Sequence, residues 1–334
     1  MEIANKSTFK PLPKVSIIVL NWNGLRFLDD CFGALARQTY TNTEVIFVDN
    51  GSTDDSVKFV TGKFPWVKII LVGENLGFCG GNNVGLKQAT GDLIALLNTD
   101  TSVAPNWLAD LVEPMLLRPE VGMTASRMVY FEQPDLIDVV GEAYHVLGQS
   151  VKIGHKKRYA PPYDQARDVF GSCAGAALYR RELFDTFGLL DETFQSNKED
   201  TDLNFRCQLG GWKCHYVPSA VCLHHVSATY KSTGWSESGS RRSRELSRNS
   251  ELVFFKNLPW PLLLLLLLPH LGYSLVNVLN MCRQGNGKAA FEGKLSFLRL
   301  LPHVWRERKL VQGKRKATSW EILKTLNWIP RRAY

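Results

Sequence analysis

The chain has 334 residues, of which 45% are hydrophobic and 22% are charged. This composition is typical of a globular protein with a core of ordinary size, and it excludes a mainly disordered or collagen-like chain. The net charge of +8 is unevenly distributed, because residues 283–334 carry 13 Lys and Arg against 3 Asp and Glu. The rest is close to neutral, so we expect no nucleic-acid-binding surface over the body, and the basic segment indicates a local anionic partner.

The cysteines and the N-terminal segment indicate the compartment. There are seven cysteines, and no two of them form a Cys-x-x-Cys pair. We therefore expect neither a disulfide framework nor a structural zinc site, and a reducing compartment fits best. Residues 1–14 are polar and lack the apolar segment of a signal peptide, so the body is expected to stay in the cytoplasm.

Residues 15–117 alternate between strand-like and helix-like patterns. Short apolar runs predict four buried strands, at residues 15–20, 44–49, 67–72 and 92–98. Helical spacing and cap-type residues predict a helix after each run. The first covers residues 25–35, the second begins near residue 55, the third ends near residue 89, and the fourth covers residues 105–117. Strands that alternate with helices of this length predict β-α-β units and a parallel sheet.

Polar residues follow these strands at the point where each one ends. Ligands of such sheets bind beyond the carboxyl ends of the strands. One polar strand end could simply meet water, but a series of four favours a binding site. The residues concerned are Asn21 and Asn23, Asp49 and Asn50, Asn75, and then Asn98 and Asp100.

The second half of the chain has weaker patterns. Residues 123–166 are less regular, and residues 169–179 are small and apolar. Residues 180–187 and 199–209 have helical patterns, while 217–225 end in a strand or turn. The polar stretch 227–250 is expected to form a loop followed by a helix.

An apolar segment lies at residues 257–282, which include no Asp, Glu, Lys or Arg. Its seven consecutive leucines stand between Pro261 and Pro269. Because prolines interrupt it, we expect an interfacial or re-entrant hairpin rather than a spanning helix. The basic segment that follows contains three tryptophans, which is typical of an anchor on an anionic membrane surface. The alternative is a buried hairpin with a solvated tail.

Three short motifs could carry chemistry. Asp100, in Asn98-Thr99-Asp100, could hold Mg²⁺ or Mn²⁺ together with substrate phosphates, or it could be a turn residue. A carboxylate in residues 199–202 could act as a general base, or these acids could only favour a helix N-terminus. His224 or His225 could bind a metal or be structural, and the two cannot face the same way in an extended segment.

A glycine-rich stretch at residues 75–85 allows the backbone to approach a phosphate or sugar closely. It is not a Walker loop, because no Gly-Lys-Ser/Thr follows. It is not a dinucleotide fingerprint either, because it follows the third predicted strand rather than the first.

Together these motifs resemble the family 2 glycosyltransferases of the GT-A fold, and within them the rhamnosyltransferase-like branch. In the first half the matching segments are Val15-Ser-Ile-Ile-Val-Leu-Asn-Trp-Asn-Gly24, Val48-Asp-Asn-Gly-Ser-Thr-Asp54, Asn75-Leu-Gly-Phe-Cys-Gly-Gly-Asn-Asn-Val-Gly85 and Leu97-Asn-Thr-Asp100. Later matches are Gly175-Ala176, Arg180-Arg-Glu182, Gly188-Leu-Leu-Asp-Glu192, Glu199-Asp-Thr-Asp-Leu203, Gly211-Trp212 and His224. The match covers residues 13–230.

The resemblance implies an α/β GT-A fold, with a mostly parallel central sheet flanked by helices and a C-terminal helical membrane-associated extension. The implied units are a tail (1–13), a glycosyltransferase domain (14–230), a loop and helix (231–258) and a membrane-association region (259–334). The domain would divide into a nucleotide-sugar half (14–130) and an acceptor and catalytic half (131–230).

The resemblance also implies roles for individual residues. The nucleotide sugar would be bound by Asn21, Asp49, Asn50, Asn75, Gly77 and Asn98. Asp200 would be the catalytic base, with Asp202 as the next candidate, and Gly175 and Glu199 would lie on the acceptor side. A divalent cation, Mg²⁺ or Mn²⁺, would be held by Asp100 and by His224, with His225 as the alternative.

The implied reaction is an inverting transfer of a sugar from a nucleotide-diphosphate sugar to a hydroxyl of a glycan or polyprenyl-linked acceptor, at the cytoplasmic face of the membrane, in cell-surface polysaccharide synthesis. Asn98 replaces the first Asp of the usual metal-binding motif, which leaves fewer acidic metal ligands. Asn50 replaces an Asp found in many relatives that use uridine nucleotides, which weakens a uridine assignment and is compatible with a thymidine nucleotide. The branch favours rhamnose as the sugar. The alternatives are a nucleotidyltransferase that uses the same pocket and a non-catalytic nucleotide-sugar-binding scaffold.

Overall fold

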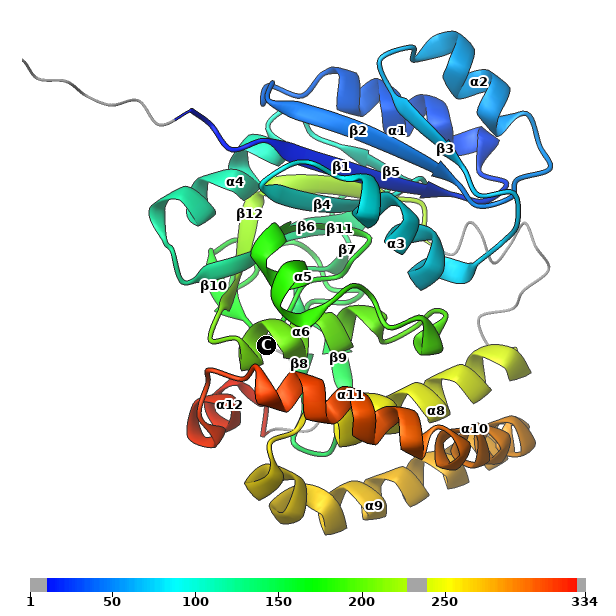
Figure 1. Ribbon diagram of the computed structural model, residues 1–334, viewed down its shortest axis with the longest axis vertical. Coiled ribbons are helices and arrows are strands. Elements are labelled where there is room, and N and C mark those ends of the chain that lie inside the picture. The colour runs from blue at the N-terminus through cyan, green and yellow to red at the C-terminus, as the bar shows by residue number, and fades with distance from the viewer. Residues whose placement is uncertain (1–10, 227–238, 329–334) are drawn as a thin grey trace, which may run out of the picture.

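A central sheet, with helices on both faces and a layer of C-terminal helices below it, makes up the protein (Figure 1). The structure is a computed structural model and describes residues 11–226 and 239–328. Most of the predicted N-terminal tail (1–13) and the first part of the polar stretch 227–250, where a loop was expected, therefore lie outside the described residues.

The first half confirms the predicted alternation of strands and helices. Its parallel strands are β1 (Val15–Asn21), β2 (Thr43–Asp49), β3 (Lys68–Leu71) and β4 (Leu93–Asn98), in the order β3-β2-β1-β4. The helices are α1 (Leu25–Ala36), α2 (Ser56–Lys63), α3 (Gly77–Gln88) and α4 (Trp107–Leu117). Ile17 belongs to the hydrophobic cluster on the face of the sheet covered by α1 and α4, whereas the next residue, Ile18, belongs to the cluster on the face covered by α3. Because side chains alternate between two covered faces, both must be apolar, which explains the continuous apolar run.

The second half extends the sheet with strands of both directions. Strand β6 (Val121–Tyr130) lies between β11 (Ala176–Arg180), which is antiparallel to it, and β12 (Lys213–His224), which is parallel to it. The expectation of irregular structure after residue 123 was therefore wrong over β6. Its Gly, Thr, Ala and Ser residues obscure the apolar pattern, yet the strand is largely buried because both of its faces are covered.

Smaller elements surround this half of the sheet. The strands are β5 (Thr101–Val103), β7 (Ile137–Val139), β8 (Glu142–Tyr144), β9 (Ser150–Lys152) and β10 (Arg167–Val169). The helices are α5 (Arg181–Phe187), the 3-10 turn η1 (Glu192–Phe194) and α6 (Glu199–Leu209). The predicted helices at 180–187 and 199–209 are thus confirmed.

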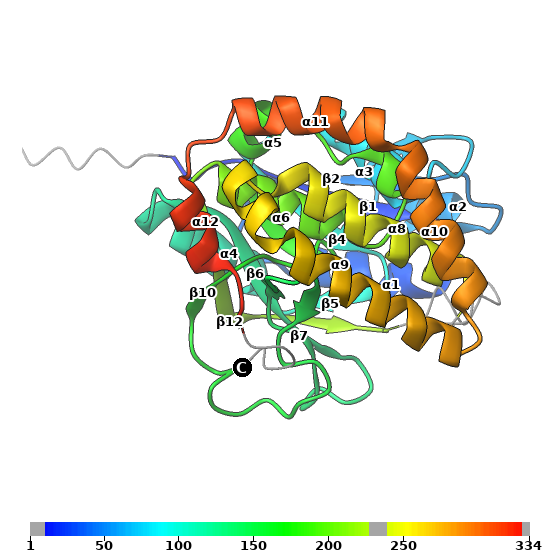
Figure 2. The ribbon, with the colours of Figure 1, turned by 90° about the horizontal axis from the view of Figure 1, so that it is seen from below.

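Five C-terminal helices form a layer that packs on the half of the body containing α6 (Figures 1 and 2). They are α8 (Ser240–Asn257), α9 (Trp260–Arg283), α10 (Gly287–Arg299), α11 (Leu301–Gly313) and α12 (Ser319–Thr325). Leu252 and Phe254 of α8 belong to the same hydrophobic cluster as Leu203 and Phe205 of α6. The layer therefore shares its core with the body.

The apolar segment is one continuous helix, so the expected hairpin within it was wrong. Pro261 lies in the first turn of α9, where the N–H that proline lacks would have no helical partner. Pro269 lies inside the helix without ending it. Among the described residues α9 is the one helix whose length and hydropathy would suffice to cross a membrane.

Candidate active site

The carboxyl ends of β1 and β2 hold a connected group of polar side chains. Asn21 ends β1, and its amide donates to Oδ1 of Asp49 at 3.2 Å and to Oγ of Ser52 at 3.0 Å. The other carboxylate oxygen of Asp49 accepts from the backbone N–H of Ser52 at 3.0 Å. Because β1 and β2 are parallel and paired at this point, Asn21 and Asp49 are direct neighbours, as the strand-end pattern predicted.

Asn50 links this edge to the glycine-rich loop. Its amide donates to Oδ1 of Asn75 and to the carbonyl of Gly77, both at 3.1 Å, and its Oδ1 accepts from the N–H of Leu76 at 3.0 Å. Gly77 has φ of +74°, a left-handed conformation that side chains with a Cβ adopt with strain. The backbone N–H of Asn50 donates to the carbonyl of Asn21 at 2.8 Å, so all the predicted nucleotide-binding residues of this half except Asn98 lie within one hydrogen-bonded network.

The loop also contacts the segment that leads into α6. The carbonyl oxygen of Gln195 accepts from the backbone N–H groups of Phe78 and Cys79 at 3.1 and 3.3 Å. Since Gln195 lies four residues before Glu199, the glycine-rich loop and the predicted base are held on neighbouring segments of the backbone.

Asn98 and Asp100 follow β4 at the same edge of the sheet. The N–H of Asn98 donates to the carbonyl of Gly175 at 2.9 Å, and a Cβ at position 175 would lie 3.2 Å from the Asn98 amide nitrogen. Gly175 thus lies directly beside Asn98. Asp100 is buried, with an exposed fraction of 8%.

Pairing of β5 with β12 brings His224 to Asp100. His224 lies opposite Thr101 in the sheet, and the N–H of His225 donates to the carbonyl of Asp100 at 2.9 Å. The Nε2 atom of His224 lies 3.5 Å from Oδ1 of Asp100. His225 points elsewhere, because its ring stacks on Phe131 with centroids 3.7 Å apart. Of the two histidines, only His224 therefore faces Asp100.

A second carboxylate holds the other side of the His224 ring. Oδ2 of Asp138, on β7, lies 2.9 Å from Nδ1 of His224. Burial would lower the pKa of His224, but the two carboxylates outweigh burial and raise it to about 9. Burial would raise the pKa of Asp138, but hydrogen bonds from His155 and His224 and the charge of Lys152 hold it well below its usual range.

The Asp100–His224 pair fits part of a divalent-cation site. No group of three or more His, Cys, Asp or Glu side chains within residues 11–226 and 239–328 is arranged to hold a metal. Mg²⁺ and Mn²⁺, however, are commonly bound through one or two protein ligands plus substrate phosphates. The oxygen and nitrogen donors of Asp100 and His224 match this pattern, so the remaining ligands would have to come from a bound diphosphate and water.

Glu199 and Asp200 begin α6, on the side of the second half of the sheet. Lys198, which precedes them, has φ of +73° and its ammonium donates to Oγ of Ser150 at 2.6 Å. Oδ1 of Asp200 accepts from the backbone N–H of Thr201 at 2.7 Å, and an oxygen of Glu199 is buried without a hydrogen-bond partner. The charge of Lys152 acts on both Asp138 and Asp200, so this lysine lies near both carboxyl groups.

Electrostatics separate the two buried carboxyl groups near α6. Burial raises the pKa of Asp200, while hydrogen bonding from Thr201 and the charges of Lys198 and Lys152 offset part of the rise. Burial and the charge of Asp200 raise the pKa of Glu142 to about 8, so Glu142 holds a proton at neutral pH. Burial also raises the pKa of Glu199 well above its usual range, and protons on Glu142 and Glu199 favour the ionised form of Asp200, which a proton acceptor must have.

Asp202 has a different environment. It is fully buried, and its carboxylate accepts hydrogen bonds from Asn257 and Lys256 at 2.8 and 3.1 Å. Nε of Arg206 lies 3.0 Å from the same carboxylate and forms an ion pair with it. A carboxylate enclosed by donors has no oxygen free to take a proton from a substrate. Asp202 is therefore a structural residue, and the geometry favours Asp200 over it.

The sequence analysis missed Asp138, Glu142 and Lys152. Asp138 and Glu142 stand in a largely apolar stretch, Ile137-Asp-Val-Val-Gly-Glu-Ala-Tyr144. Because buried carboxylates need partners, an acid in such a stretch indicates a buried polar contact, and this signal was available. It gives no partner, however, since the contacts come from distant segments.

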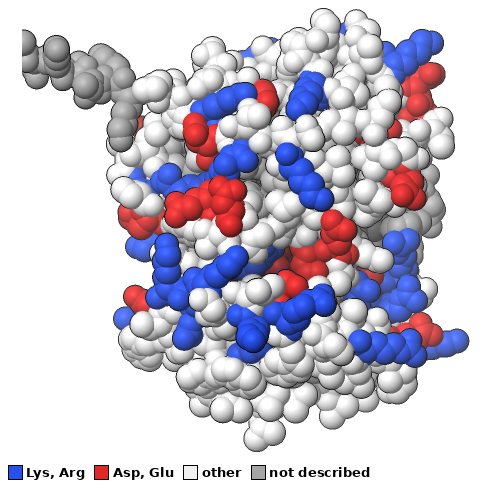
Figure 3. Space-filling view, in the orientation of Figure 1, with Lys and Arg blue, Asp and Glu red and all other residues white. Residues whose placement is uncertain are grey.

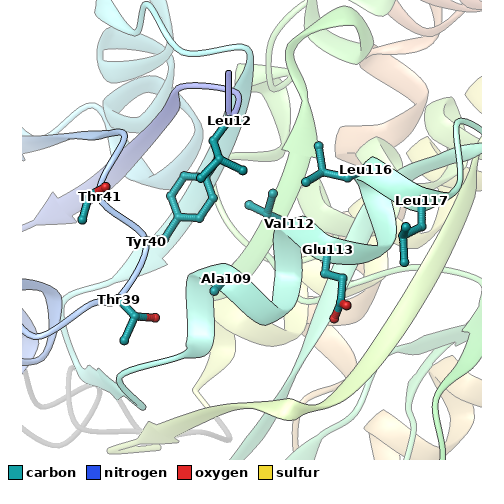
Figure 4. Close-up of a pocket in the computed structure, with 9 residues that line it drawn as sticks. All are labelled: Leu12, Thr39, Tyr40, Thr41, Ala109, Val112, Glu113, Leu116 and Leu117. Atoms are coloured by element: carbon teal, nitrogen blue, oxygen red, sulfur yellow. The ribbon is translucent and has the colours of Figure 1, made fainter. Parts of the chain in front are cut away.

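The groove shown in Figure 4 lies at the other edge of the sheet. It has a volume of about 330 Å³ and is lined by Leu12, Tyr40, Val112, Leu116 and neighbouring residues. Leu12 and Tyr40 precede β1 and β2, so the groove is at the amino ends of these strands. It contains none of the predicted site residues.

Comparisons with known proteins agree with this arrangement. A family model described as glycosyl transferase family 2 matches residues 16–188. The chain is 29% identical over 247 residues to an uncharacterized protein of Sinorhizobium fredii and 30% identical over 232 residues to the O-antigen biosynthesis protein RfbC of Myxococcus xanthus. These matches cover 70% and 65% of this chain but 26% and 18% of those longer proteins.

A third relative is closer to this chain in length. The N-acetylglucosaminyl-diphospho-decaprenol L-rhamnosyltransferase of Mycobacterium tuberculosis is 26% identical over 235 residues, which are 63% of this chain and 75% of that protein. Among solved structures, GalNAc-T7 with UDP, GalNAc and Mn²⁺ matches 64% of this chain and 43% of its own, with a TM-score of 0.54 and 18% identity.

The mannosyltransferase PcManGT of Pyrobaculum calidifontis, in complex with GDP-Man and Mn²⁺, matches 94% of this chain and 87% of its own, with a TM-score of 0.52 and 18% identity. At these identities the two structures show a shared fold, and they confirm the expected GT-A architecture.

Proposed function

Because the chain belongs to glycosyltransferase family 2, we propose that it transfers a sugar from a nucleotide-diphosphate sugar to a hydroxyl group of a glycan or lipid-linked acceptor, with inversion at the anomeric carbon. The single observation that supports the proposal is that Asp49 and the Asp100–His224 pair lie at the carboxyl ends of the strands, with Lys152 near both Asp138, the partner of His224, and Asp200. The carboxyl ends of the strands are where ligands of open α/β sheets bind.

The nucleotide would bind at the network of Asn21, Asp49 and Asn50. The left-handed backbone at Gly77 and the glycines of α3 allow close approach of the diphosphate to the main chain. Asp100 and Nε2 of His224 would hold a divalent cation, which when bound neutralises charge that develops on the diphosphate leaving group. Asn98 and Gly175 would lie near the transferred sugar, because they are adjacent to each other beside Asp100.

Asp200 would take the proton from the acceptor hydroxyl as the oxygen attacks the anomeric carbon. The bond from that carbon to the diphosphate oxygen breaks as the new glycosidic bond forms, and the leaving electron pair stays on the diphosphate. A single displacement of this kind inverts the configuration and needs no carboxylate nucleophile. Glu199 would border the acceptor.

For the donor we propose a deoxyhexose such as rhamnose, carried by dTDP or UDP. The name of the mycobacterial relative supports rhamnose and a polyprenyl diphosphate acceptor, and the name of the Myxococcus relative supports a role in cell-surface polysaccharide synthesis. Asn50, in place of an acid found in many uridine-dependent relatives, is compatible with a thymidine nucleotide.

We also propose that the protein lies on the cytoplasmic surface of a membrane through α9 and α10. Their outer faces expose a set of large apolar side chains: Trp260, Leu264, Leu265, Leu268, Leu271, Leu275, Val276, Leu279, Phe291, Leu295 and Leu298. In Figure 3 the lower end of the molecule, where α9 lies in Figure 1, is largely white beneath a row of Lys and Arg. An exposed apolar surface with basic residues beside it suits an anionic bilayer.

An interfacial position suits α9 better than a spanning one. Leu262, Leu263 and Leu266 of this helix are buried, and Nε2 of His270 lies 2.8 Å from a carboxylate oxygen of Glu251 in α8. A spanning helix would have to give up these contacts and bury an unpaired polar group in lipid.

Donor binding tests the proposal. The purified protein is titrated with dTDP-rhamnose, UDP-linked sugars and GDP-mannose, each with Mn²⁺, with Mg²⁺ and with EDTA. We expect selective binding of one donor, weakened in EDTA, and transfer to a polyprenyl-diphosphate-linked or glycan acceptor. Donor binding without transfer to any acceptor would favour the scaffold alternative, and no binding of any nucleotide sugar by folded protein would contradict the proposal.

A further inference from the structure

Asp138 is a fully buried carboxylate to which neither the family resemblance nor the proposed reaction gives a role. It lies on β7, which pairs with β6, while His224 lies on β12, which also pairs with β6. Its Oδ1 accepts from the ammonium of Lys152 at 3.0 Å, and its backbone carbonyl lies 3.0 Å from Nδ1 of His155. Its Oδ2 is directed at Nδ1 of His224, 2.9 Å away.

This contact decides which ring nitrogen of His224 is available. A carboxylate beside Nδ1 accepts a hydrogen bond from that atom and keeps its proton there, so Nε2 is the nitrogen that would release its proton and supply a lone pair to a cation. Nε2 is the atom that faces Asp100. Its separation of 3.5 Å from Oδ1 of Asp100 is long for a good hydrogen bond, but it lets both atoms contact one cation at about 2.1 Å each.

The surroundings of Asp138 fix its own position. Lys152 and His155 bind one side of the residue, and complete burial prevents the carboxylate from turning toward solvent. The side chain can therefore hold the imidazole in one orientation, which lowers the entropy that His224 would lose on binding a cation.

We propose that Asp138 is a positioning residue that holds the His224 imidazole with Nε2 directed at Asp100 and thereby sets the affinity of the protein for a divalent cation. The inference rests on the cation site of the proposed function. It adds a residue that touches neither cation nor substrate and acts through His224 alone.

The test measures binding of Mn²⁺ alone to the full chain, by electron paramagnetic resonance of the free ion and by calorimetry. The variant is Asp138→Asn, which keeps the shape of the side chain. Its amide has one accepting oxygen, which cannot serve both His224 and Lys152. We expect the Kd for Mn²⁺ to rise by about 10-fold to 100-fold. The matched control is Asp135→Asn in the turn before β7, an exposed residue whose change should leave the Kd within about 2-fold.

A double-mutant cycle separates positioning from a general structural effect. In a His224→Ala background, Asp138→Asn should cause no further loss of Mn²⁺ affinity, because the residue has nothing left to orient. An equal loss in both backgrounds would overturn the inference, and so would wild-type affinity in a folded Asp138→Asn protein. If Asp138→Asn does not fold, as judged by thermal denaturation, Asp138→Ser is measured in the same cycle.

Failure of the inference and failure of the proposed function are distinguishable. If the wild-type protein binds Mn²⁺ and the Asp138 variant binds it equally well, the inference alone fails. If the wild-type protein binds no Mn²⁺, either alone or with dTDP or UDP, the metal-assisted form of the proposed function fails and the inference fails with it.

Discussion

The ammonium group of Lys256 lies 3.1 Å from Oδ2 of Asp202, and both side chains are buried. Lys256 is in α8 of the C-terminal layer, and Asp202 is in α6, two residues after Asp200. Lys256 also forms an ion pair of 2.8 Å with Asp191, the residue immediately before η1. The C-terminal layer is therefore joined by buried charges to the helix that begins with the predicted base.

Lys256→Met is expected to destabilise the protein strongly. The change keeps the length of the side chain but removes the buried cation that Asp191 and Asp202 share. Arg206 remains beside Asp202 and His303 beside Asp191, but loss of one partner from a buried ion pair still costs about 3–5 kcal/mol in comparable cases. The free energy of unfolding from urea titration measures it. The control is Lys63→Met, which breaks an exposed ion pair with Asp29 and should cost less than about 1 kcal/mol. A similar small loss for both variants would show that α8 does not stabilise α6 through Lys256.

Asp200→Asn is expected to retain donor binding and to lose transfer by about 10²-fold to 10⁴-fold, the usual contribution of a general base. The fold should be preserved, because Asn can still accept from the N–H of Thr201. Initial rates and donor Kd are measured side by side. Asp202→Asn serves as the comparison and should lower the free energy of unfolding instead, because its contacts are structural. Transfer at the wild-type rate by Asp200→Asn would remove Asp200 from the mechanism.

The pH dependence of transfer follows from the raised pKa of Asp200. A base acts in its ionised form, so kcat/KM should fall as the pH decreases through a value above the usual pKa of Asp, which is about 3.9. Lys198→Met removes a nearby positive charge that favours the carboxylate and so raises the pKa of Asp200 further, and the acidic limb should move to higher pH.

Rates between about pH 5 and pH 9 measure this shift. Lys157→Met, a change on an exposed loop, should leave the profile unchanged. A limb that stays in place, or moves to lower pH, in Lys198→Met would contradict the assignment of Asp200 as the titrating base.

Local patterns predicted the first half of the fold because they depend on nearest neighbours. The runs 17–20 in β1, 45–48 in β2 and 93–97 in β4 are apolar, since both faces of these strands are covered. The polar ends of the strands lie at one edge because the strands are parallel. Strand β6 was not predicted because its small and hydroxyl side chains interrupt the apolar pattern, although most of them are buried in the folded chain.

Local sequence patterns were not sufficient to predict which residues meet at the candidate site. Asp100 and His224 meet only because β5 pairs with β12, a contact between distant segments that no spacing rule contains, and the family resemblance was what put them together. Asp138 belongs to no motif, so its contact with His224 emerged only from the folded chain. The prolines of α9 led to a wrong prediction because packing between helices overrides their local signal. They are usual signals of a break, but here one lies in the first turn and the packing of α9 on α8 sustains the helix across the other.

Membrane binding is expected to depend on the outer face of α9. Deletion of residues 259–334 would be a poor test, because it would also expose α8 and parts of the shared core. Leu268→Glu combined with Leu275→Glu is sharper, since both side chains are more than half exposed and contribute little to folding. The paired variant should lose co-sedimentation with vesicles that contain anionic phospholipid, because inserting two carboxylates into the interface costs several kcal/mol.

The control is Leu116→Glu with Leu117→Glu on α4, which adds the same charges to exposed positions at the amino-end groove. It should sediment with the vesicles as wild type does, and high salt should weaken binding of both, because the basic residues beside α9 attract the anionic lipid. Equal sedimentation of the α9 variant and the wild type would show that this face does not contact the bilayer. Loss of sedimentation in the α4 variant alone would place the membrane contact at the opposite edge of the sheet.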